Sequence, residues 1–497
     1  MHEAQTFGLL VLVMATAGLA AVLSNRLSER IKVPLPLLFL IAAAAARQLV
    51  DGIHAPPHRV VERVVTIALL LVLFDGGRQI GWSLFRTAAA PIAVVGVLGT
   101  FLTVAAAGLL VHLTFGLDWY LALLVATAVS PTDPAVVFSV LGQREIAGRS
   151  STILEGESGA NDPVGIALMV SLIAAGGVGI SAFGHVASSF ALQMIVGLIV
   201  GTAGGRALLW HMRHVSLPSE GLYPLRTLAG AMLLFGIASV AHGSGFLAVF
   251  VAGIVISDAS APYKREIERF HSALASLGEI VAFLVLGLAV DLQVLVRSDV
   301  WIPGLVTGAA LALIIRPVLV GLCLLPAGLQ RNERRFVLFA GLKGAVPILL
   351  GTYILAAHVP HAERLYGIVV VVVIFSVVVQ GSLVPTAAEW LQLPIRMTEP
   401  QPWALGVRLR DEPQGVHHFT ITPGSPADGS LLREITDLPA DVSISFLVRD
   451  SQLVTVNQNT RLEAGDQVVV LTDPAQSDEL RNRFETSQPP PGLDPAA

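Results

Sequence analysis

Charged residues and cysteine are both scarce in this chain of 497 residues, and each shortage narrows the class of protein. Only 13% of the residues are charged, against 54% that are hydrophobic, and the mean hydropathy is +0.72. A soluble chain of this length needs more charge than that, so the composition predicts a polytopic membrane protein. The single cysteine, Cys323, excludes an intrachain disulfide and a metal site of the CxxC type.

Concentrated basic charge is also missing. The net charge of −5 comes from residues scattered over short stretches, so no patch for nucleic acid is expected. The first residues, Met1-His2-Glu3, lack the basic region of a cleavable signal. The apolar run from Phe7 to Leu23 is long enough to span a bilayer, and we expect it to stay as the first membrane helix.

Long apolar runs are what the chain has in abundance. A window of about 19 residues predicts about thirteen membrane helices. They lie near residues 6–24, 34–50, 60–77, 90–113, 119–141, 151–177, 188–212, 222–241, 243–257, 271–290, 300–325, 334–357 and 365–388. The eighth and ninth spans meet at His242-Gly243, so twelve spans remain an alternative.

Basic residues alternate between the loops. One set of loops carries Arg26, Arg30, Lys32, Arg78, Arg86, Arg144, Arg149, Arg206, Arg213, Arg226, Lys264, Arg265, Arg269, Arg331, Arg334 and Arg335. The intervening loops carry only Arg59, Arg63, Arg297 and Arg364. By the positive-inside rule, this asymmetry favours an odd number of spans, with the amino terminus outside and the carboxyl terminus in the cytoplasm.

A polar stretch interrupts the sixth span. Residues 155–163 read E-G-E-S-G-A-N-D-P, with three carboxylates, a hydroxyl and an amide. An ionisable group at bilayer depth costs about 2.5 kcal/mol or more, so each needs a counter-charge, a water-filled cavity or a cation. On helical spacing Ser158 and Asp162 share a face, while Glu157 and Asn161 form a neighbouring stripe. The stretch therefore predicts a transport site.

Two spans contain helix-breaking residues at mid-depth. Residues 130–134 read S-P-T-D-P and residues 341–347 read G-L-K-G-A-V-P. Broken helices are tolerated in a membrane only where protein covers them or they line a cavity. Two breaks seven spans apart predict an inverted repeat with two crossing broken helices, whose free carbonyls can bind a cation. Asp133 and Lys343 can offset the helix dipoles, and direct ion contact is an equal alternative for Asp133.

At these segments the chain resembles a known family. The stretches at 130–134, 157–163, 243–253 and 341–347 are similar to the signature segments of NhaP-type monovalent cation/proton antiporters. The subgroup it resembles is the cell volume regulation protein A type, potassium/proton antiporters with a cytoplasmic regulatory tail. The similarity runs from about Phe7 to Leu391 and resumes in the tail.

The resemblance implies a transport activity, a location in the cell and an oligomeric state. The chain would exchange a monovalent cation, K⁺ before Na⁺, for H⁺ by alternating access, serving cation, pH and volume homeostasis. It would be a secondary transporter and not an enzyme, without a cofactor, embedded in the cell inner membrane. The resemblance also implies a homodimer.

Site roles follow from the resemblance as well. Asp162 would bind the cation or the proton, and the main-chain carbonyl of Thr132 and the hydroxyl of Ser158 would be further cation ligands. Asp75 would contribute through water. Asn161 would hydrogen-bond Asp133.

The remaining roles concern buried charges. Glu157 would form a structural ion pair with Arg316, and Lys343 would place its charge at the broken helix. Many relatives have glutamate where Asp75 stands and arginine where Lys343 stands.

The residue types at 161 and 162 predict the stoichiometry. A desolvated carboxylate can hold a cation or a proton, and the two compete for it. Asn161 is neutral where a second carboxylate would add one transported charge, worth about 2.3 kcal/mol per 100 mV. We therefore expect electroneutral one-for-one exchange. Glu155 and Glu279 also fall in or near spans, and the sequence assigns neither a role.

Histidines lie near the predicted span ends, which favours interfacial or solvated placement over a buried pH sensor. This set comprises His211, His214, His271, His358 and His361.

After the membrane domain at 1–391, the character of the chain changes. Prolines mark a linker at 392–405, and 406–485 alternates in short strands before a helix, which predicts a small cytoplasmic αβ domain. It resembles the C-terminal subdomain of TrkA-type potassium regulators, which implies regulation through dimerisation or a small regulatory ligand. A passive folded tail is the alternative. Residues 486–497 are proline-rich and predicted to be disordered.

Two other function classes stay open. Residues 156–159 read G-E-S-G, which matches a serine-protease pattern, but no histidine stands mid-span as a base. A ligand-gated potassium efflux channel usually carries a dinucleotide-binding G-x-G-x-x-G turn, which the tail lacks.

Overall fold

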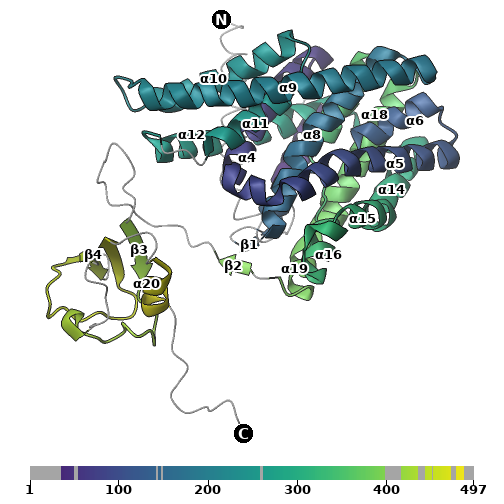
Figure 1. The fold of residues 1–497 in the computed structure, drawn as a ribbon. Helices are drawn as coiled ribbons and strands as arrows, with labels where there is room; N and C mark the ends of the chain where they lie inside the picture. Colours follow the sequence, from purple (N-terminus) through teal and green to yellow (C-terminus); the bar gives the residue numbers. More distant parts are fainter. Residues whose placement is uncertain are drawn as a thin grey trace, which may run out of the picture. The chain divides into compact units, whose positions relative to one another are not determined.

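A computed structural model describes most of the chain. The described residues are 35–49, 54–141, 144–146, 149–257, 261–393, 395–397, 416–434, 443–449, 452–471 and 477–485. The chain divides into two compact units, Met1–Ala404 and Leu405–Ala497, which Figure 1 colours from purple to green and from green to yellow. The predicted first span at 6–24 and the predicted disordered tail at 486–497 lie outside the described residues.

The first unit is a bundle of helices (Figure 1). Its α-helices are α3 (Leu35–Leu49), α4 (His58–Ala93), α5 (Thr100–Phe115), α6 (Trp119–Ala128), α7 (Pro134–Leu141), α8 (Arg149–Ala175), α9 (Ile180–His214), α10 (Leu222–Val240), α11 (Gly245–Ser257), α12 (Lys264–Ala289), α13 (Leu292–Leu295), α14 (Ser298–Ala310), α15 (Gly321–Cys323), α16 (Arg331–Phe339), α17 (Ala345–Ala356), α18 (Ala362–Phe375) and α19 (Val384–Trp390). Three π-helical segments join them, η1 (Val94–Gly99), η2 (Leu311–Val320) and η4 (Ser376–Gln380), together with the 3₁₀ turn η3 (Leu325–Ala327).

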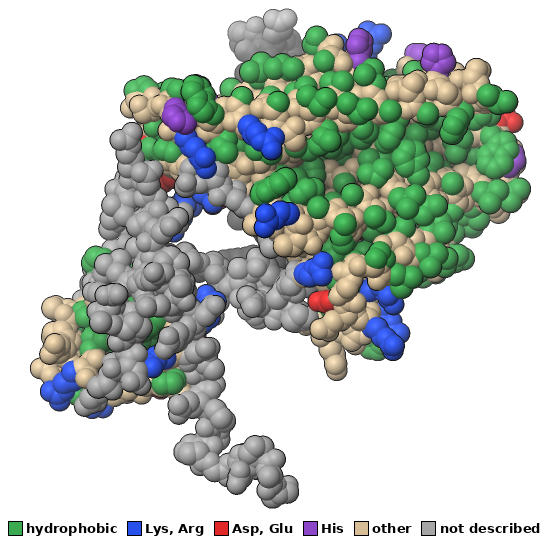
Figure 2. Space-filling model, in the orientation of Figure 1, with side chains coloured by type: hydrophobic (Ala, Val, Ile, Leu, Met, Phe, Trp, Pro, Cys, Tyr) green, Lys and Arg blue, Asp and Glu red, His purple; other side chains and the backbone are tan. Residues whose placement is uncertain are grey.

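These helices confirm the predicted polytopic membrane architecture. Each predicted span after the first coincides with helical segments. Among the described residues, seven helices are long and apolar enough to cross a membrane, and Trp119–Ala128 and Ala345–Ala356 are shorter apolar helices. Figure 2 shows hydrophobic side chains over much of the visible face of this unit, with few lysine and arginine side chains among them. Such a surface suits contact with lipid.

The two predicted helix breaks are present, and the broken helices meet. α6 ends at Ala128 and α7 begins at Pro134, while α16 ends at Phe339 and α17 begins at Ala345. The N–H of Asp133 donates to the carbonyl of Leu342 at 2.8 Å, so the two non-helical segments touch. The inverted repeat stays a prediction.

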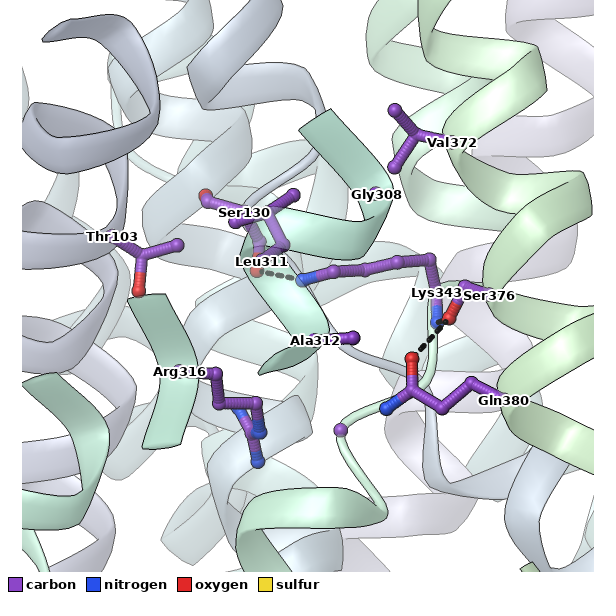
Figure 3. Close-up of a pocket in the computed structure, with 11 residues that line it drawn as sticks. Thr103, Ser130, Gly308, Leu311, Ala312, Arg316, Lys343, Val372, Ser376 and Gln380 are labelled. Carbon is purple, nitrogen blue, oxygen red and sulfur yellow. Dashed lines mark hydrogen bonds between the residues drawn. The ribbon is translucent and has the colours of Figure 1, made fainter. Parts of the chain in front are cut away.

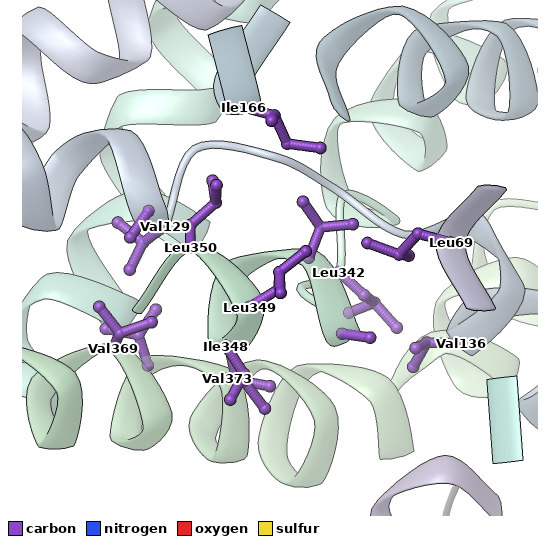
Figure 4. Close-up of a cluster of buried hydrophobic side chains, with 14 of the residues drawn as sticks. Leu69, Val129, Val136, Ile166, Leu342, Ile348, Leu349, Leu350, Val369 and Val373 are labelled. Carbon is purple, nitrogen blue, oxygen red and sulfur yellow. The ribbon is translucent and has the colours of Figure 1, made fainter. Parts of the chain in front are cut away.

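The point where the two non-helical segments touch is called the crossing below. Apolar side chains fill the space around it (Figure 4). Leu342 lies in one break, and Val129 and Val136 flank the other; all three are fully buried. Ile166 of α8 and Leu349 of α17 join the same cluster. The polar groups of the crossing are therefore set in an apolar wall, which limits their access to water.

Two features differ from expectation. β1 (Arg144–Ile146), in the loop between α7 and α8, pairs antiparallel with β2 (Ile395–Met397). The predicted linker at 392–405 thus begins in a two-stranded sheet.

The interfacial placement predicted for the histidines is wrong for His271, which is 2% exposed and bonds Thr227 through Nε2 at 2.6 Å.

The second unit confirms the small αβ domain. Its sheet has the order β3-β6-β4-β5 and is antiparallel throughout, with α20 following β6. The bounds are β3 (Val416–Thr420), β4 (Ser443–Arg449), β5 (Gln452–Val454), β6 (Gln467–Leu471) and α20 (Ser477–Phe484), with the 3₁₀ turn η5 (Leu432–Glu434). Phe419, Leu447, Val468 and Phe484 form its core. β3 is not among the strands predicted from the sequence.

Candidate functional site

α8 carries its polar residues on a fully packed helix. Glu157, Ser158, Asn161 and Asp162 are all buried, at 2% to 6% exposure. Pro163 follows at once within the same helix and has no N–H, so the carbonyl of Gly159 loses its usual helical donor. This part of α8 therefore adds a freed carbonyl to the hydroxyl, amide and carboxylate groups.

Asp162 has an oxygen that the protein leaves unused. Its Oδ2 accepts a hydrogen bond from Ser158 Oγ at 3.5 Å, one helical turn away. Its Oδ1 is buried and has no hydrogen-bond partner among the described residues, and no ion pair to Asp162 occurs among them. Buried polar atoms are nearly always paired, so this oxygen is where the α8 carboxylate can accept a proton or a cation. Carboxylate and hydroxyl oxygens suit a hard cation.

Asn161 ties α8 to the first break. Its Nδ2 donates to Thr132 Oγ1 at 2.8 Å, and the N–H of Thr132 donates to Asn161 Oδ1 at 3.4 Å. The amide thus bonds Thr132 where the resemblance implied Asp133. Both bonds hold the Thr132 backbone beside the helix that carries Asp162, where its carbonyl can serve an ion.

Asp133 lies at two helix beginnings. Its Oδ1 accepts from the N–H of Ala135 at 2.9 Å in the first turn of α7, and its carboxylate also faces the N–H of Ala345, where α17 begins. Carboxylates are stabilised at the positive ends of helices. A Cβ at position 344 would overlap the Asp133 carboxylate. Glycine, which has no Cβ, therefore fits at this position.

Lys343 supplies the opposite charge at a helix end. Its Nζ donates to the carbonyl of Ser130 at 2.8 Å, just beyond the end of α6 (Figure 3). Its own N–H donates to Ser376 Oγ at 3.0 Å, and Ser376 Oγ donates to Gln380 Oε1 at 3.2 Å. These residues line one pocket together with Arg316 and Thr103. The two breaks thus have a carboxylate at the helix beginnings and an ammonium at a helix end.

Glu157 and Arg316 form a buried bidentate ion pair. Arg316 Nη1 lies 2.6 Å from Glu157 Oε1, and Nη2 lies 2.9 Å from Oε2. Arg316 also donates to the carbonyls of Leu338 at 2.9 Å and Val337 at 3.1 Å. The pair joins α8 to η2 and to the end of α16, and the two charges offset each other.

Asp75 is engaged in another polar network. Its oxygens accept from Arg78 Nη2 at 2.6 Å, Gln79 Nε2 at 2.6 Å and Ser272 Oγ at 3.2 Å. None of these described contacts involves Ser158 or Asp162. Arg78 and Gln79 follow Asp75 by three and four residues on one helix, a spacing that by itself indicates local pairing.

Two members of the site are not among the residues predicted from the sequence. The carbonyl of Ser130 accepts from Lys343, and Gly344 makes room for Asp133. Proline at position 131 was the available signal for the first. The glycine within G-L-K-G was the signal for the second.

Comparison with known proteins adds an independent line of argument. The family described as "Sodium/hydrogen exchanger, transmembrane" matches residues 13–390, and the TrkA-C domain family matches residues 416–485. The K(+)/H(+) antiporter NhaP of Alkalimonas amylolytica is 32% identical over 94% of this chain and 82% of its own length. The K(+)/H(+) antiporter NhaP2 of Shewanella oneidensis is 31% identical over 97% of this chain and 84% of its own length.

A solved structure shares the fold. The sodium proton antiporter MjNhaP1 from Methanocaldococcus jannaschii superposes with a TM-score of 0.64 at 20% sequence identity, covering 77% of this chain and 98% of that chain. At this identity, the likeness shows a shared fold.

Proposed function

The chain belongs to the family of transmembrane sodium/hydrogen exchangers, and from this premise we propose that it exchanges a monovalent cation, with K⁺ favoured over Na⁺, for H⁺ at Asp162. The observation that carries the proposal is the buried, unpaired Oδ1 of Asp162. Its neighbours supply the other oxygens, since Ser158 Oγ bonds the same carboxylate and Thr132 is fixed beside it by Asn161. The preference for K⁺ rests on the names of the two relatives.

Charge balance at the crossing supports one-for-one exchange. Glu157 and Arg316 offset each other, and Asp133 and Lys343 occupy helix ends of opposite sign. Asp162 is then the remaining acid of α8 that needs a partner, so it carries either one cation or one proton. An empty, charged Asp162 is strongly disfavoured at bilayer depth, which ties movement of the site to occupancy.

The orientation, the assembly and the role of the tail belong to the same proposal. We place the carboxyl terminus in the cytoplasm and the amino terminus outside, with two copies forming a homodimer in the cell inner membrane. The β1–β2 pairing supports this orientation, because it puts the basic loop after α7 and the chain after α19 on one side. The TrkA-C domain would take a small regulatory ligand.

The experiment compares Asp162→Asn with the wild type in everted membrane vesicles loaded with a pH-sensitive dye. Addition of K⁺, Na⁺ or Li⁺ in turn should dequench the dye in wild-type vesicles, most strongly with K⁺. Asp162→Asn should abolish the response to each cation. Ser171→Ala is the matched control, because Ser171 is buried on the same helix and bonds Ser189 away from the site.

Two results would contradict the proposal. Full exchange by Asp162→Asn would show that this carboxylate does not carry the ions. In proteoliposomes, collapse of the membrane potential should leave the exchange rate unchanged, and a large loss would refute electroneutral exchange.

A further inference from the structure

A further acid, Glu279 on α12, is half-buried and has no part in the site described above. Its Oε1 is buried without a hydrogen-bond partner, and the structure shows no ion pair to Glu279 within its described ranges. The group with which it interacts electrostatically is Asp133, the carboxylate at the crossing. Two acids that share a low-dielectric region cannot both stay charged without a proton or a cation nearby.

The packing of α12 brings this acid to the crossing. α12 contacts α3, α4, α10 and α17, and α17 begins at Ala345 beside Asp133. The preceding residue, Gly278, lies against the backbone of α4, where an added Cβ would be 3.2 Å from the carbonyl of Ala68. Glu279 is half-buried and directly follows this closely packed position of α12.

The basic groups of the neighbouring helices are engaged elsewhere. Arg47 of α3 donates to the carbonyl of Val290 at 3.0 Å, and Arg226 of α10 donates to the carbonyl of Val215 at 2.7 Å. Arg78 of α4 pairs with Asp75. Lys343, which precedes α17, donates to Ser130. No basic side chain of these packed elements, within the described part of the chain, neutralises Glu279.

Other titratable groups on these elements also have partners of their own. His271 of α12 bonds Thr227 of α10, and Tyr353 of α17 bonds Thr66 of α4. Glu62 of α4 is a further acid and would only add negative charge. The neutralising species for Glu279 must therefore come from solution, and a monovalent cation and H⁺ are the ions this protein exchanges.

We propose that Glu279 is a second cation-binding and proton-binding carboxylate, one that receives the ion next to the crossing before it reaches Asp162. The inference rests on the proposed exchange at Asp162 and adds a residue on a different helix to it. Glu279 raises the local concentration of the cation by its charge, and H⁺ competes for the same oxygens. Asp162 still sets the stoichiometry.

The test measures K⁺/H⁺ exchange by purified full-length protein in proteoliposomes over a range of K⁺ concentration and pH. Glu279→Gln should raise the KM for K⁺ about three- to tenfold, the effect of losing one nearby charge, with kcat within about twofold of the wild type. Its KM should depend less on pH, because one competing proton site is gone. Glu279→Asp keeps the charge and should lie between the two.

Glu266→Gln is the control, since Glu266 lies exposed in the first turn of the same helix and should not change KM. Thermal unfolding in detergent separates an ion site from a structural contact. In buffer free of alkali cations, Glu279→Gln should melt at or above the wild-type temperature, because an unpaired buried acid is removed. Added K⁺ should then stabilise it less than it stabilises the wild type.

Several results would overturn the inference. One is a Glu279→Gln protein with wild-type KM and an unchanged pH profile of KM. Another is a variant that melts well below the wild type and loses transport at every K⁺ concentration, as loss of a structural contact would produce. Asp162→Asn distinguishes failure of the exchange proposed at Asp162 from failure of the ion binding proposed at Glu279. If Asp162→Asn is inactive while Glu279→Gln matches the wild type, only the role of Glu279 is refuted.

Discussion

The N–H of Asp133 donates to the carbonyl of Leu342 at 2.8 Å, so the two broken helices are joined through their backbones at the point where each is interrupted. Both segments are non-helical there, and the prolines and glycines within them account for the interruptions. Side chains then balance the exposed helix ends, with Asp133 at the beginnings of α7 and α17 and Lys343 at the end of α6. The positions of the proposed cation ligands, Thr132 and Asp162, depend on this crossing remaining closed.

A substitution at Gly344 tests how closely the two broken helices pack against each other at the crossing. An added Cβ would overlap the Asp133 carboxylate, so Gly344→Ala must displace either the carboxylate or the backbone. We expect exchange to fall at least about tenfold, which needs only about 1.4 kcal/mol of misplacement at the site. Gly236→Ala in α10 is the control, because no atom lies within 4 Å of its added Cβ. Equal exchange rates of the two variants in vesicles would contradict the prediction.

Substitutions of Lys343 test whether its positive charge stabilises the end of α6. Lys343→Met removes the donor to the Ser130 carbonyl and leaves that helix end unbalanced, so we expect a loss of about 1 to 2 kcal/mol in stability. Lys343→Arg keeps a donor and a positive charge and should retain most of the stability and the exchange. Thermal unfolding of the detergent-purified protein measures the first effect and vesicle assays the second. A Lys343→Met protein with wild-type melting temperature would argue against this role.

The buried pair of Glu157 and Arg316 should behave differently when one partner or both are removed. Arg316→Met alone leaves Glu157 charged and unpaired, which should destabilise the protein by about 3 to 5 kcal/mol. Combining it with Glu157→Gln removes the uncompensated charge and should restore part of the melting temperature. Asp299→Asn breaks exposed ion pairs and should change stability by less than about 1 kcal/mol. A double variant no more stable than Arg316→Met would contradict the pairing.

The sequence predicted the membrane helices well for a simple physical reason. Apolar runs such as that of α9 are long, and proline or glycine at mid-depth marks an interruption whatever the tertiary structure. The polar stretch of α8 was equally plain, because buried acids are rare in membranes. These features are local in the sequence, so they can be recognised without knowing which helices pack together.

Partners across the bundle could not be predicted in the same way. Asn161 was expected to bond Asp133 and bonds Thr132, a choice that depends on side-chain directions one residue apart. His271 was placed at an interface from its position near a span end, yet Thr227 of another helix buries and pairs it. Two partners of Asp75, Arg78 and Gln79, lie three and four residues along its own helix, a spacing from which this pairing can be predicted.

The pairing of β1 with β2 lay beyond sequence reasoning altogether, because the two strands have three residues each and are far apart in the chain. It joins the loop between α7 and α8 to the segment that leads along the chain to the second unit. α7 begins next to Asp133 and α8 carries Asp162, so this small sheet connects the start of the linker with both elements of the site. A cross-link between the strands can therefore test both the register and its effect on transport.

Glu145 and Arg396 are directly opposite in the antiparallel register. Opposed Cα atoms in such a pair lie about 4.5 to 5.5 Å apart, within the range that a disulfide spans. We expect Glu145→Cys with Arg396→Cys, in a Cys323→Ala background, to form a disulfide on mild oxidation. Arg144→Cys with Ile395→Cys is two residues out of register and should cross-link much less. Peptide mass spectrometry under non-reducing conditions measures both yields.

The same cysteine pair tests whether the loop must move during transport. If the α7–α8 loop shifts relative to β2 as the site changes sides, oxidation should lower exchange by Glu145→Cys/Arg396→Cys, and reduction should restore it. The out-of-register pair controls for oxidation itself and should be unaffected. Equal cross-linking of the two pairs would refute the register. Full exchange by the completely cross-linked protein would show instead that β1 and β2 stay together throughout the transport cycle.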